Sequence, residues 1–291
     1  MDMSTNSADP APAIDSELES HYNLRARHPE RGAIYHGFAQ RSAATRRNAS
    51  AHLDLRYGPE PSSTMDVFVP QAESPAPLLV FIHGGYWRAL DKNNFSFVAD
   101  AYLDAGVAVA MPNYALVPHA TVGAIVDQVC ASMDWLMGEA PRLGFDPGRV
   151  LISGHSAGGH MAAIMACPQR APALRGRLLG CVCLSGLFDL QPLLRTSVNT
   201  DLNMTPAEAL ALNVYAAELA DVPLLLAAGE LETVGFRSQS EEFARYLAAR
   251  GRAAQSMIVP GRNHFDLVGE FADPGSALFA KTLALLRGAR Q

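Results

Sequence analysis

A serine between small residues is the clearest chemical signal in this chain. Residues 149–160 read RVLISGHSAGGH, with Ser156 at the centre of a Gly-x-Ser-x-Gly pattern. The apolar run before the serine predicts a buried strand, and residues 161–166 after it predict a helix. A serine at such a sharp turn has a strained backbone and needs small neighbours. We therefore interpret Ser156 as a nucleophile, the alternative being a chance match in a chain with 23 glycines.

Two backbone segments predict N–H donors for an oxyanion. Ala157 opens the helix after the serine, where the helix N-terminus favours a developing negative charge. The second segment, HGGYW at 83–87, directly follows an apolar run. Its two successive glycines let the backbone turn its N–H groups toward a ligand, so Gly85 and Tyr86 are predicted donors. His83 is predicted to fix this loop by hydrogen bonds, with a catalytic base as the alternative.

Alternating strand and helix patterns surround these residues and predict an α/β domain. Short apolar runs between helical patterns are typical of a mostly parallel central sheet with helices on both faces. An antiparallel pair of strands is predicted first, at 53–57 and 65–69. The predicted parallel strands are 78–82, 107–111, 150–153, 179–184, 223–228 and 255–259. The predicted helices between them are 94–105, 122–137, 243–249 and 277–286.

The polar start of the chain and one long connection complete the predicted organisation. Residues 1–16 are too polar to pack and predict a disordered tail, which leaves 17–291 as a single domain. Residues 192–220 form the longest connection and predict either a lid over the site or a plain crossover. Within it, Thr205 is the expected helix cap and Pro206 the expected first helical residue.

Residues 17–50 carry aromatic side chains among many arginines. This mixture predicts a small N-terminal cap of one or two short helices laid over the domain. We interpret the arginines as a solvated helix face, with contacts to an acidic substrate or partner as the alternative. The arginines concerned are Arg25, Arg27, Arg31, Arg41, Arg46 and Arg47.

The overall composition favours a small neutral or apolar substrate. The 291 residues are 49% hydrophobic, which suffices for a large core. The net charge of -6 gives no general attraction to nucleic acid or to an anionic membrane, so neither is expected as a partner. The start of the chain has no apolar core of signal-peptide length, so a cytoplasmic location is expected. A homodimer is left open.

These motifs resemble the α/β-hydrolase superfamily. The serine pattern at 154–158 and the HGGYW loop at 83–87 carry the resemblance together. Tyr86-Trp87 followed by DKNNF at 91–95 is similar to kynurenine formamidases and their esterase relatives. Hormone-sensitive-lipase-type esterases usually have a third glycine where this chain has Tyr86. The resemblance runs from about residue 17 to the C-terminus and implies an α/β-hydrolase fold.

The resemblance also implies the partners of the serine. In this superfamily the acid and then the histidine follow the nucleophile along the chain. Glu232 lies after the predicted strand 223–228, where the acid is expected, and His264 follows the last predicted strand, where the base is expected. Many formamidases have aspartate at the acid position. Glu230 is therefore kept as the alternative acid, and Asp189 as a weaker one.

The function implied is that of a serine hydrolase that removes a small, formyl-type acyl group from an aromatic amide or ester. Tyr86, Trp87 and His155 are the predicted substrate-binding residues, although Tyr86 and Trp87 alternatively only pack the loop. No cofactor is expected, and no metal, because the nine histidines lack H-x-x-x-H or H-E-x-x-H spacing. The main alternative is a general short-chain carboxylesterase, and a non-catalytic binding protein of the same fold is more remote.

Overall fold

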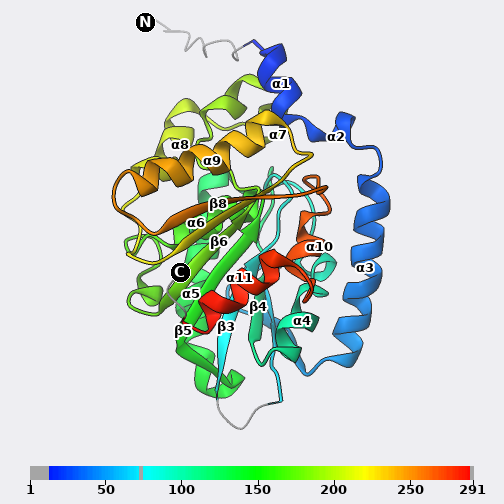
Figure 1. Ribbon diagram of the computed structural model, residues 1–291, viewed down its shortest axis with the longest axis vertical. Helices are drawn as coiled ribbons and strands as arrows, with labels where there is room; N and C mark the ends of the chain where they lie inside the picture. The colour runs from blue at the N-terminus through cyan, green and yellow to red at the C-terminus, as the bar shows by residue number, and fades with distance from the viewer. Residues whose placement is uncertain (1–12, 72–74, 289–291) are drawn as a thin grey trace, which may run out of the picture.

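An eight-stranded sheet forms the centre of the computed structural model, which describes residues 13–71 and 75–288 (Figure 1). The strand order is β1-β2-β4-β3-β5-β6-β7-β8, and β2 pairs antiparallel with both of its neighbours while every other pair is parallel. The strands are β1 Ala51–Arg56, β2 Thr64–Phe68, β3 Ala76–Ile82, β4 Ala108–Pro112, β5 Phe145–His155, β6 Leu178–Leu184, β7 Leu224–Gly229 and β8 Ala254–Val259. The predicted α/β class and mostly parallel sheet are confirmed.

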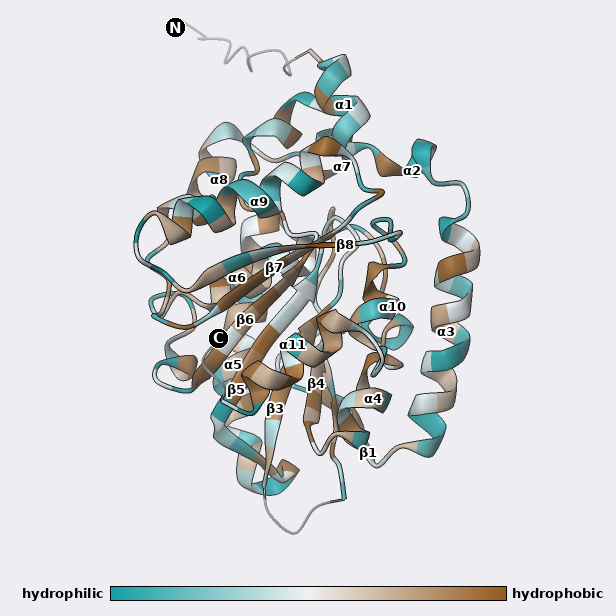
Figure 2. Ribbon diagram, viewed as in Figure 1, coloured by the Kyte–Doolittle hydropathy of each residue, from teal (hydrophilic) through white to brown (hydrophobic). Residues whose placement is uncertain are grey.

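Both faces of this sheet are covered, which explains why its central strands read as unbroken apolar runs. Alternate side chains of β3 enter two separate cores: Leu78 and Val80 pack on one side, whereas Leu79 and Phe81 pack on the other. Figure 2 shows the hydrophobic colour concentrated on these central strands.

Helices line each of these two cores. The core that contains Leu78 receives side chains from α5 Val122–Leu143, α6 Ala157–Met165 and α9 Val234–Ala248. The core that contains Leu79 receives side chains from α4 Val98–Asp104, α10 Leu267–Phe271 and α11 Ala277–Leu286. Helix α9 begins nine residues before the predicted start at 243, because the buried polar residues Gln239 and Ser240 continue its inner face.

The N-terminal segment forms three helices, more than the one or two predicted. They are α1 Ser16–Tyr22, α2 Leu24–Arg27 and α3 Arg31–Asn48. The inner face of α3 continues from Phe38 through the small polar residues Ser42 and Thr45, which hydrophobic spacing alone does not reveal. Thr45 Oγ1 donates to Asp100 Oδ2 at 2.9 Å, which ties α3 to α4.

The predicted disordered tail falls mostly outside the described residues, which begin at residue 13. Its end needs correction: Asp15 accepts hydrogen bonds from the backbone N–H groups of Glu17 and Leu18 and caps α1. The Asp15 N–H also donates to the Arg195 carbonyl oxygen at 2.8 Å. The packed part of the chain therefore starts before residue 17.

The long connection predicted at 192–220 consists of short helical turns. It contains η3 Gln191–Arg195, α7 Val198–Leu202, α8 Pro206–Ala211 and η4 Val214–Ala216. The predicted cap is confirmed, since Thr205 Oγ1 accepts from the Glu208 N–H at 3.1 Å. Whether this segment opens and closes stays a prediction. Within residues 13–71 and 75–288, no helix is long and apolar enough to cross a membrane.

The strand register brings the ends of several strands to one edge of the sheet. Ile82 of β3 lies opposite Gly154 of β5, and His155 of β5 lies opposite Leu184 of β6. Because these strands are parallel, the loops that follow them leave the sheet side by side. This edge carries the candidate active site.

Candidate active site

Ser156 lies at the tight turn between β5 and α6. Its φ and ψ angles are 57° and -119°, a strained conformation for a residue other than glycine. The turn requires small neighbours: a Cβ atom at Gly154 would lie 2.2 Å from the Gly158 carbonyl oxygen, and one at Gly158 would lie 2.1 Å from the Ile82 carbonyl oxygen. The structure therefore has the strand, turn and helix that the sequence pattern predicts here.

Glu232 and His264 form a buried pair beside this turn. Glu232 follows β7, His264 follows β8, and the His264 Nδ1 atom lies 2.8 Å from Glu232 Oε2. The side chain of His264 is only 4% exposed and that of Glu232 is 0% exposed, so the pair is shielded from water. A carboxylate on Nδ1 holds the imidazole in the tautomer that leaves Nε2 able to accept a proton.

The two alternative acids lie elsewhere. Glu230 is exposed and its Oε2 accepts from the Gly261 N–H at 2.9 Å. Asp189 Oδ1 accepts from the Gln191 N–H and from Asn213 Nδ2, both at 3.0 Å. Of the three carboxylates, Glu232 is the one that contacts His264.

Sequence reasoning missed one further polar residue at this site. Ser185 follows β6 and its Oγ donates to Glu232 Oε1 at 2.5 Å, while the Gly229 N–H donates to the same oxygen at 2.7 Å. These two donors fix the carboxylate plane and leave Oε2 for His264. A signal was present, because Ser185 directly follows a buried strand next to the one that leads to Ser156.

The loop after β3 lies against the serine turn. A Cβ atom at Gly84 would lie 3.1 Å from the Cβ of Ser156. The loop has positive φ angles at Gly85 (118°) and Tyr86 (51°). The backbone N–H groups of Gly85, Tyr86 and Ala157 have no hydrogen-bond acceptor within residues 13–71 and 75–288. They are thus available to a ligand oxygen, as an oxyanion hole requires.

His83 stabilises this loop through stacking and hydrogen bonds. Its ring stacks on Tyr114 with centroids 4.2 Å apart, and its two nitrogens lie 2.8 Å from the Gly84 carbonyl oxygen and 3.1 Å from Asn113 Oδ1. Burial lowers the pKa of His83, which keeps the imidazole neutral at pH 7. These contacts match the predicted structural role of His83.

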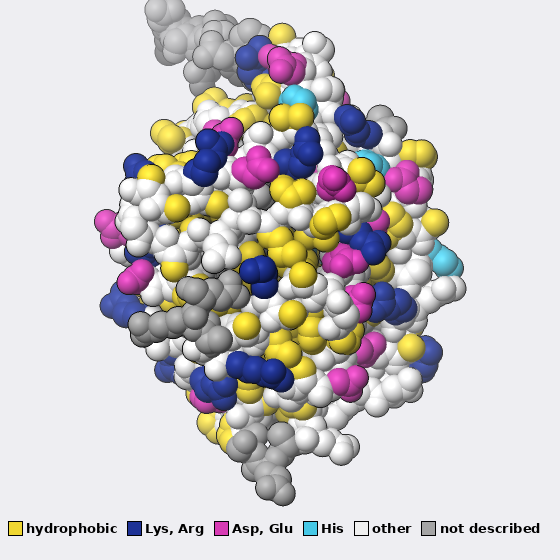
Figure 3. Space-filling model, viewed as in Figure 1, with side chains coloured by type: hydrophobic (Ala, Val, Ile, Leu, Met, Phe, Trp, Pro, Cys, Tyr) yellow, Lys and Arg dark blue, Asp and Glu magenta, His cyan; other side chains and the backbone are white. Residues whose placement is uncertain are grey.

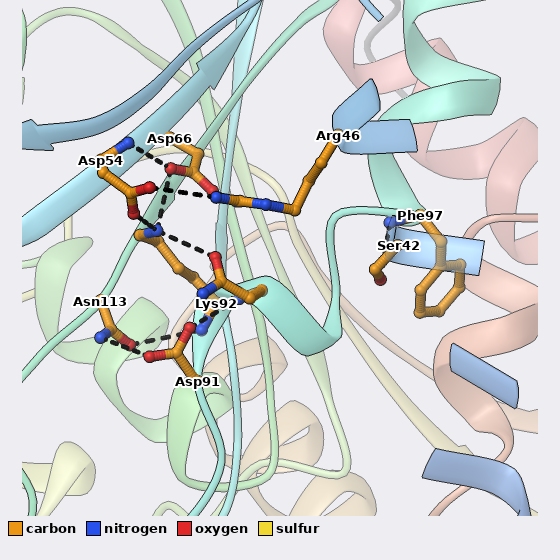
Figure 4. Close-up of polar contacts among 9 residues, drawn as sticks. Ser42, Arg46, Asp54, Asp66, Asp91, Lys92, Phe97 and Asn113 are labelled. Carbon is orange, nitrogen blue, oxygen red and sulfur yellow. Dashed lines mark hydrogen bonds and ion pairs between the residues drawn. The ribbon is translucent and has the colours of Figure 1, made fainter. Parts of the chain in front are cut away.

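A buried ion cluster anchors the segment after the loop (Figure 4). Lys92 Nζ lies 2.6 Å from Asp54 Oδ1 and 2.9 Å from Asp66 Oδ1, and Arg46 pairs with both carboxylates. The side chains of Lys92 and Asp66 are 1% and 0% exposed. The neighbouring Asp91 accepts from Asn113 Nδ2 at 2.9 Å, so the cluster connects to the residue that holds His83.

A cavity of about 260 Å³ opens over the serine turn. Ser156, His264, Gly85 and Tyr86 all line it, so the structure brings the predicted nucleophile, base and two oxyanion donors to one space. The other walls are largely aromatic and apolar: they include Tyr22, Leu24, Tyr35, Leu90, Val198 and Phe265. The N-terminal helices thus contribute to the site, as a cap would.

One predicted substrate contact is wrong. Trp87 has no exposed surface and does not line the cavity; its ring packs edge-on against His160 with centroids 5.3 Å apart. Trp87 therefore packs the loop, the alternative considered from the sequence. Tyr86 remains in the cavity wall, and its hydroxyl donates to the Tyr22 carbonyl oxygen at 2.8 Å.

His155 contacts His264 and helps to position it. Its side chain borders the cavity but is only 1% exposed, and its Nε2 lies 2.8 Å from the His264 carbonyl oxygen. The two rings lie 4.7 Å apart. Burial lowers the pKa of His155 well below its usual value, and the nearby His264 lowers it further. A neutral His155 that donates to the His264 backbone helps to place the base.

No group of three His, Cys, Asp or Glu side chains that could hold a metal ion occurs in the described part of the chain. On the face drawn in Figure 3, basic and acidic side chains are interspersed rather than gathered into one large patch.

Known proteins are similar to this chain in sequence and in fold. Residues 65–209 match the BD-FAE family model. Kynurenine formamidase of Danio rerio is 28% identical over 80% of this chain and 81% of its own. The crystal structure of a candidate thioesterase from Silicibacter sp. TM1040 is 31% identical, covers 93% of this chain and 99% of its own, and superposes with a TM-score of 0.83.

A more distant structure supports the fold. Esterase B from Lactobacillus rhamnosis has a TM-score of 0.67 and is 20% identical over 91% of this chain and 96% of its own. Together with the mostly parallel sheet and the serine turn, these similarities show that the chain belongs to the α/β-hydrolase superfamily, which includes kynurenine formamidases and esterases.

Proposed function

We propose that this protein hydrolyses N-formyl arylamides, of which N-formylkynurenine is the representative, with Ser156, His264 and Glu232 as the catalytic residues. The observation that carries the proposal is the common cavity: Ser156, His264 and Gly85 line one space of about 260 Å³. Glu232 contacts the Nδ1 atom of His264 and so orients its ring. Sequence similarity to kynurenine formamidase over most of both chains supports the choice of substrate.

The first half of the proposed reaction forms an acyl-enzyme. Ser156 Oγ attacks the formyl carbon while its proton passes to His264 Nε2, and Glu232 stabilises the resulting imidazolium. The negative carbonyl oxygen then accepts hydrogen bonds from the backbone N–H groups of Gly85, Tyr86 and Ala157. When the C–N bond breaks, His264 gives its proton to the departing nitrogen, and the arylamine leaves.

The second half releases the acyl group. A water molecule gives a proton to His264 and attacks the formyl ester on Ser156. Collapse of that intermediate returns the proton to Ser156 and releases formate. Each proton transfer in this reaction is made to or from His264.

The shape of the cavity supports an aromatic leaving group. Tyr22, Tyr35, Tyr86 and Phe265 give it aromatic walls, which suit a planar ring. Its small volume favours a short acyl chain over a long one. A short-chain carboxylesterase would use the same residues, because an ester carbonyl is attacked in the same way.

The test is a comparison of substrates on the purified protein. We would measure kcat/KM for N-formylkynurenine beside p-nitrophenyl esters from acetate to octanoate. A clear preference for the formamide supports the proposal. A preference for an ester replaces it with the carboxylesterase and leaves the roles of the catalytic residues to be tested separately.

A further inference from the structure

The charged residues that line the catalytic cavity are all cationic. Arg25, Arg31 and Arg88 line it together with Ser156 and His264, and no aspartate or glutamate does. A cavity with positive charge and apolar walls favours a ligand with a negative charge. The catalytic reaction proposed above uses none of these arginines, so their presence needs another explanation.

Two of the three arginines already have partners. Arg31 Nη1 donates to the carbonyl oxygens of Arg25 and His28 at 2.6 Å and 3.0 Å, so it fixes the turn between α2 and α3. Arg88 pairs with Asp201 of α7, and its side chain is only 10% exposed. Both guanidinium groups therefore have a structural role in addition to their charge.

Arg25 differs from both. Its side chain is exposed, and it has no ion-pair partner within residues 13–71 and 75–288. Arg25 and Arg88 line the same cavity, and their like charges repel each other: burial lowers the pKa of Arg88, and the positive charge of Arg25 lowers it further. An anion between them would relieve this repulsion.

We propose that Arg25 is a specificity-determining residue that selects substrates with a carboxylate on the leaving group. The guanidinium of Arg25 receives the carboxylate in a paired hydrogen-bonding geometry while the acyl carbon lies at Ser156. Arg88 adds a second positive charge to the cavity wall. This inference rests on the proposed hydrolase site, but it holds for an amide or an ester leaving group alike.

The test uses two matched substrate pairs, each a carboxylate and its uncharged methyl ester. The first pair is N-formylkynurenine and its methyl ester, assayed by formate release. The second is 4-acetoxybenzoate and its methyl ester, assayed by phenol release. In each pair the reacting bond is the same, so a change that a variant makes in the ratio of kcat/KM within the pair reports recognition of the carboxylate.

Arg25→Gln and Arg27→Gln are the matched variants. Arg27 is also exposed and belongs to the same helix, but it does not line the cavity. Neither change removes the Arg25 carbonyl oxygen that Arg31 binds. We expect Arg25→Gln to lower kcat/KM about tenfold for the carboxylate substrates, mainly through KM, and to leave the methyl esters within about twofold. Arg27→Gln should change neither, and added salt should weaken the wild-type preference.

The outcomes separate this inference from the proposed function. If Arg25→Gln slows both members of a pair equally, or changes neither, the inference is overturned. If the protein cleaves no formamide but Arg25 still governs the acetoxybenzoate pair, the formamidase proposal fails and carboxylate selection stands. If formamides are cleaved with no dependence on Arg25, the reverse holds.

Discussion

Glu232 holds His264 in one orientation because two other groups determine how its carboxylate lies. Its Oε2 contacts His264 Nδ1 at 2.8 Å, while its Oε1 accepts from Ser185 Oγ and from the Gly229 N–H. The main-chain N–H can only donate, so the Oε1 position requires an oxygen. A glutamine in this place would keep its oxygen there and turn its amide nitrogen toward His264.

Glu232→Gln should therefore lower kcat by about 10³ to 10⁴, because the amide would force Nδ1 to accept and put the imidazole proton on Nε2. A base protonated on Nε2 cannot take the proton of Ser156. The matched control is Glu230→Gln, whose side chain is exposed and caps only the Gly261 N–H. A larger loss for Glu230→Gln than for Glu232→Gln would move the acid to Glu230.

Ser156→Ala should lower kcat by about 10⁴ or more, because Ser156 is the only serine among the described lining residues of the cavity and no threonine or cysteine is among them. Alanine has the same backbone cost as serine at a φ of 57°, so the thermal midpoint should stay close to that of the parent. The control is Ser153→Ala in β5, the strand that leads to Ser156, because the buried Oγ of Ser153 has no partner in the described residues. Retention of more than about a hundredth of the activity by Ser156→Ala would contradict the nucleophile assignment.

Asp66→Asn should lower the free energy of unfolding by about 3 to 5 kcal/mol, because it leaves the buried Lys92 and the partly buried Arg46 with less compensating charge. Asp127→Asn is the matched control. Asp127 pairs with Arg170 at the surface, with side chains 70% and 36% exposed, so the loss there should stay within about 1 kcal/mol. Urea unfolding of both variants measures the difference, and equal losses would show that the buried cluster contributes no more than a surface pair.

The sequence predicted the sheet and the serine turn because both leave strong local patterns. Strands covered on both faces read as apolar runs, as in β3, and the glycines beside Ser156 are required by contacts closer than any side chain permits. The positions of Glu232 and His264 followed from the order of strands in the family the chain resembles.

The remaining features depend on packing between distant segments. The aromatic pair within the HGGYW loop illustrates this, because Tyr86 lines the cavity whereas Trp87 is buried in the core, a difference set by the backbone turn. Arg25 reaches the site from a helix about 130 residues before Ser156, as the numbering shows. Spacing along the chain carries no signal for such a contact. The cytoplasmic location and the homodimer stay predictions.

Acid should destabilise the protein through its buried histidines, and His160 provides the clearest case. It has no exposed surface, its Nε2 lies 2.9 Å from the Leu212 carbonyl oxygen, and burial lowers its pKa to about 4. In the unfolded chain the pKa of a histidine is about 6.5, so the unfolded state binds the proton first. The stability that His160 contributes is present above about pH 6.5 and is lost as the pH falls toward 4, by about 2 kcal/mol between pH 7 and pH 5.

His160→Gln keeps a donor for the Leu212 carbonyl oxygen and removes the titrating group. We expect its free energy of unfolding in urea to fall less between pH 7 and pH 5 than that of the parent. Part of the acid effect should persist, because burial also lowers the pKa of His83 and His155. His52→Gln, at an exposed position of β1, should keep the full pH dependence of the parent. An unchanged pH dependence in His160→Gln would mean that His160 is already protonated in the folded protein, or that the site opens to water before the chain unfolds.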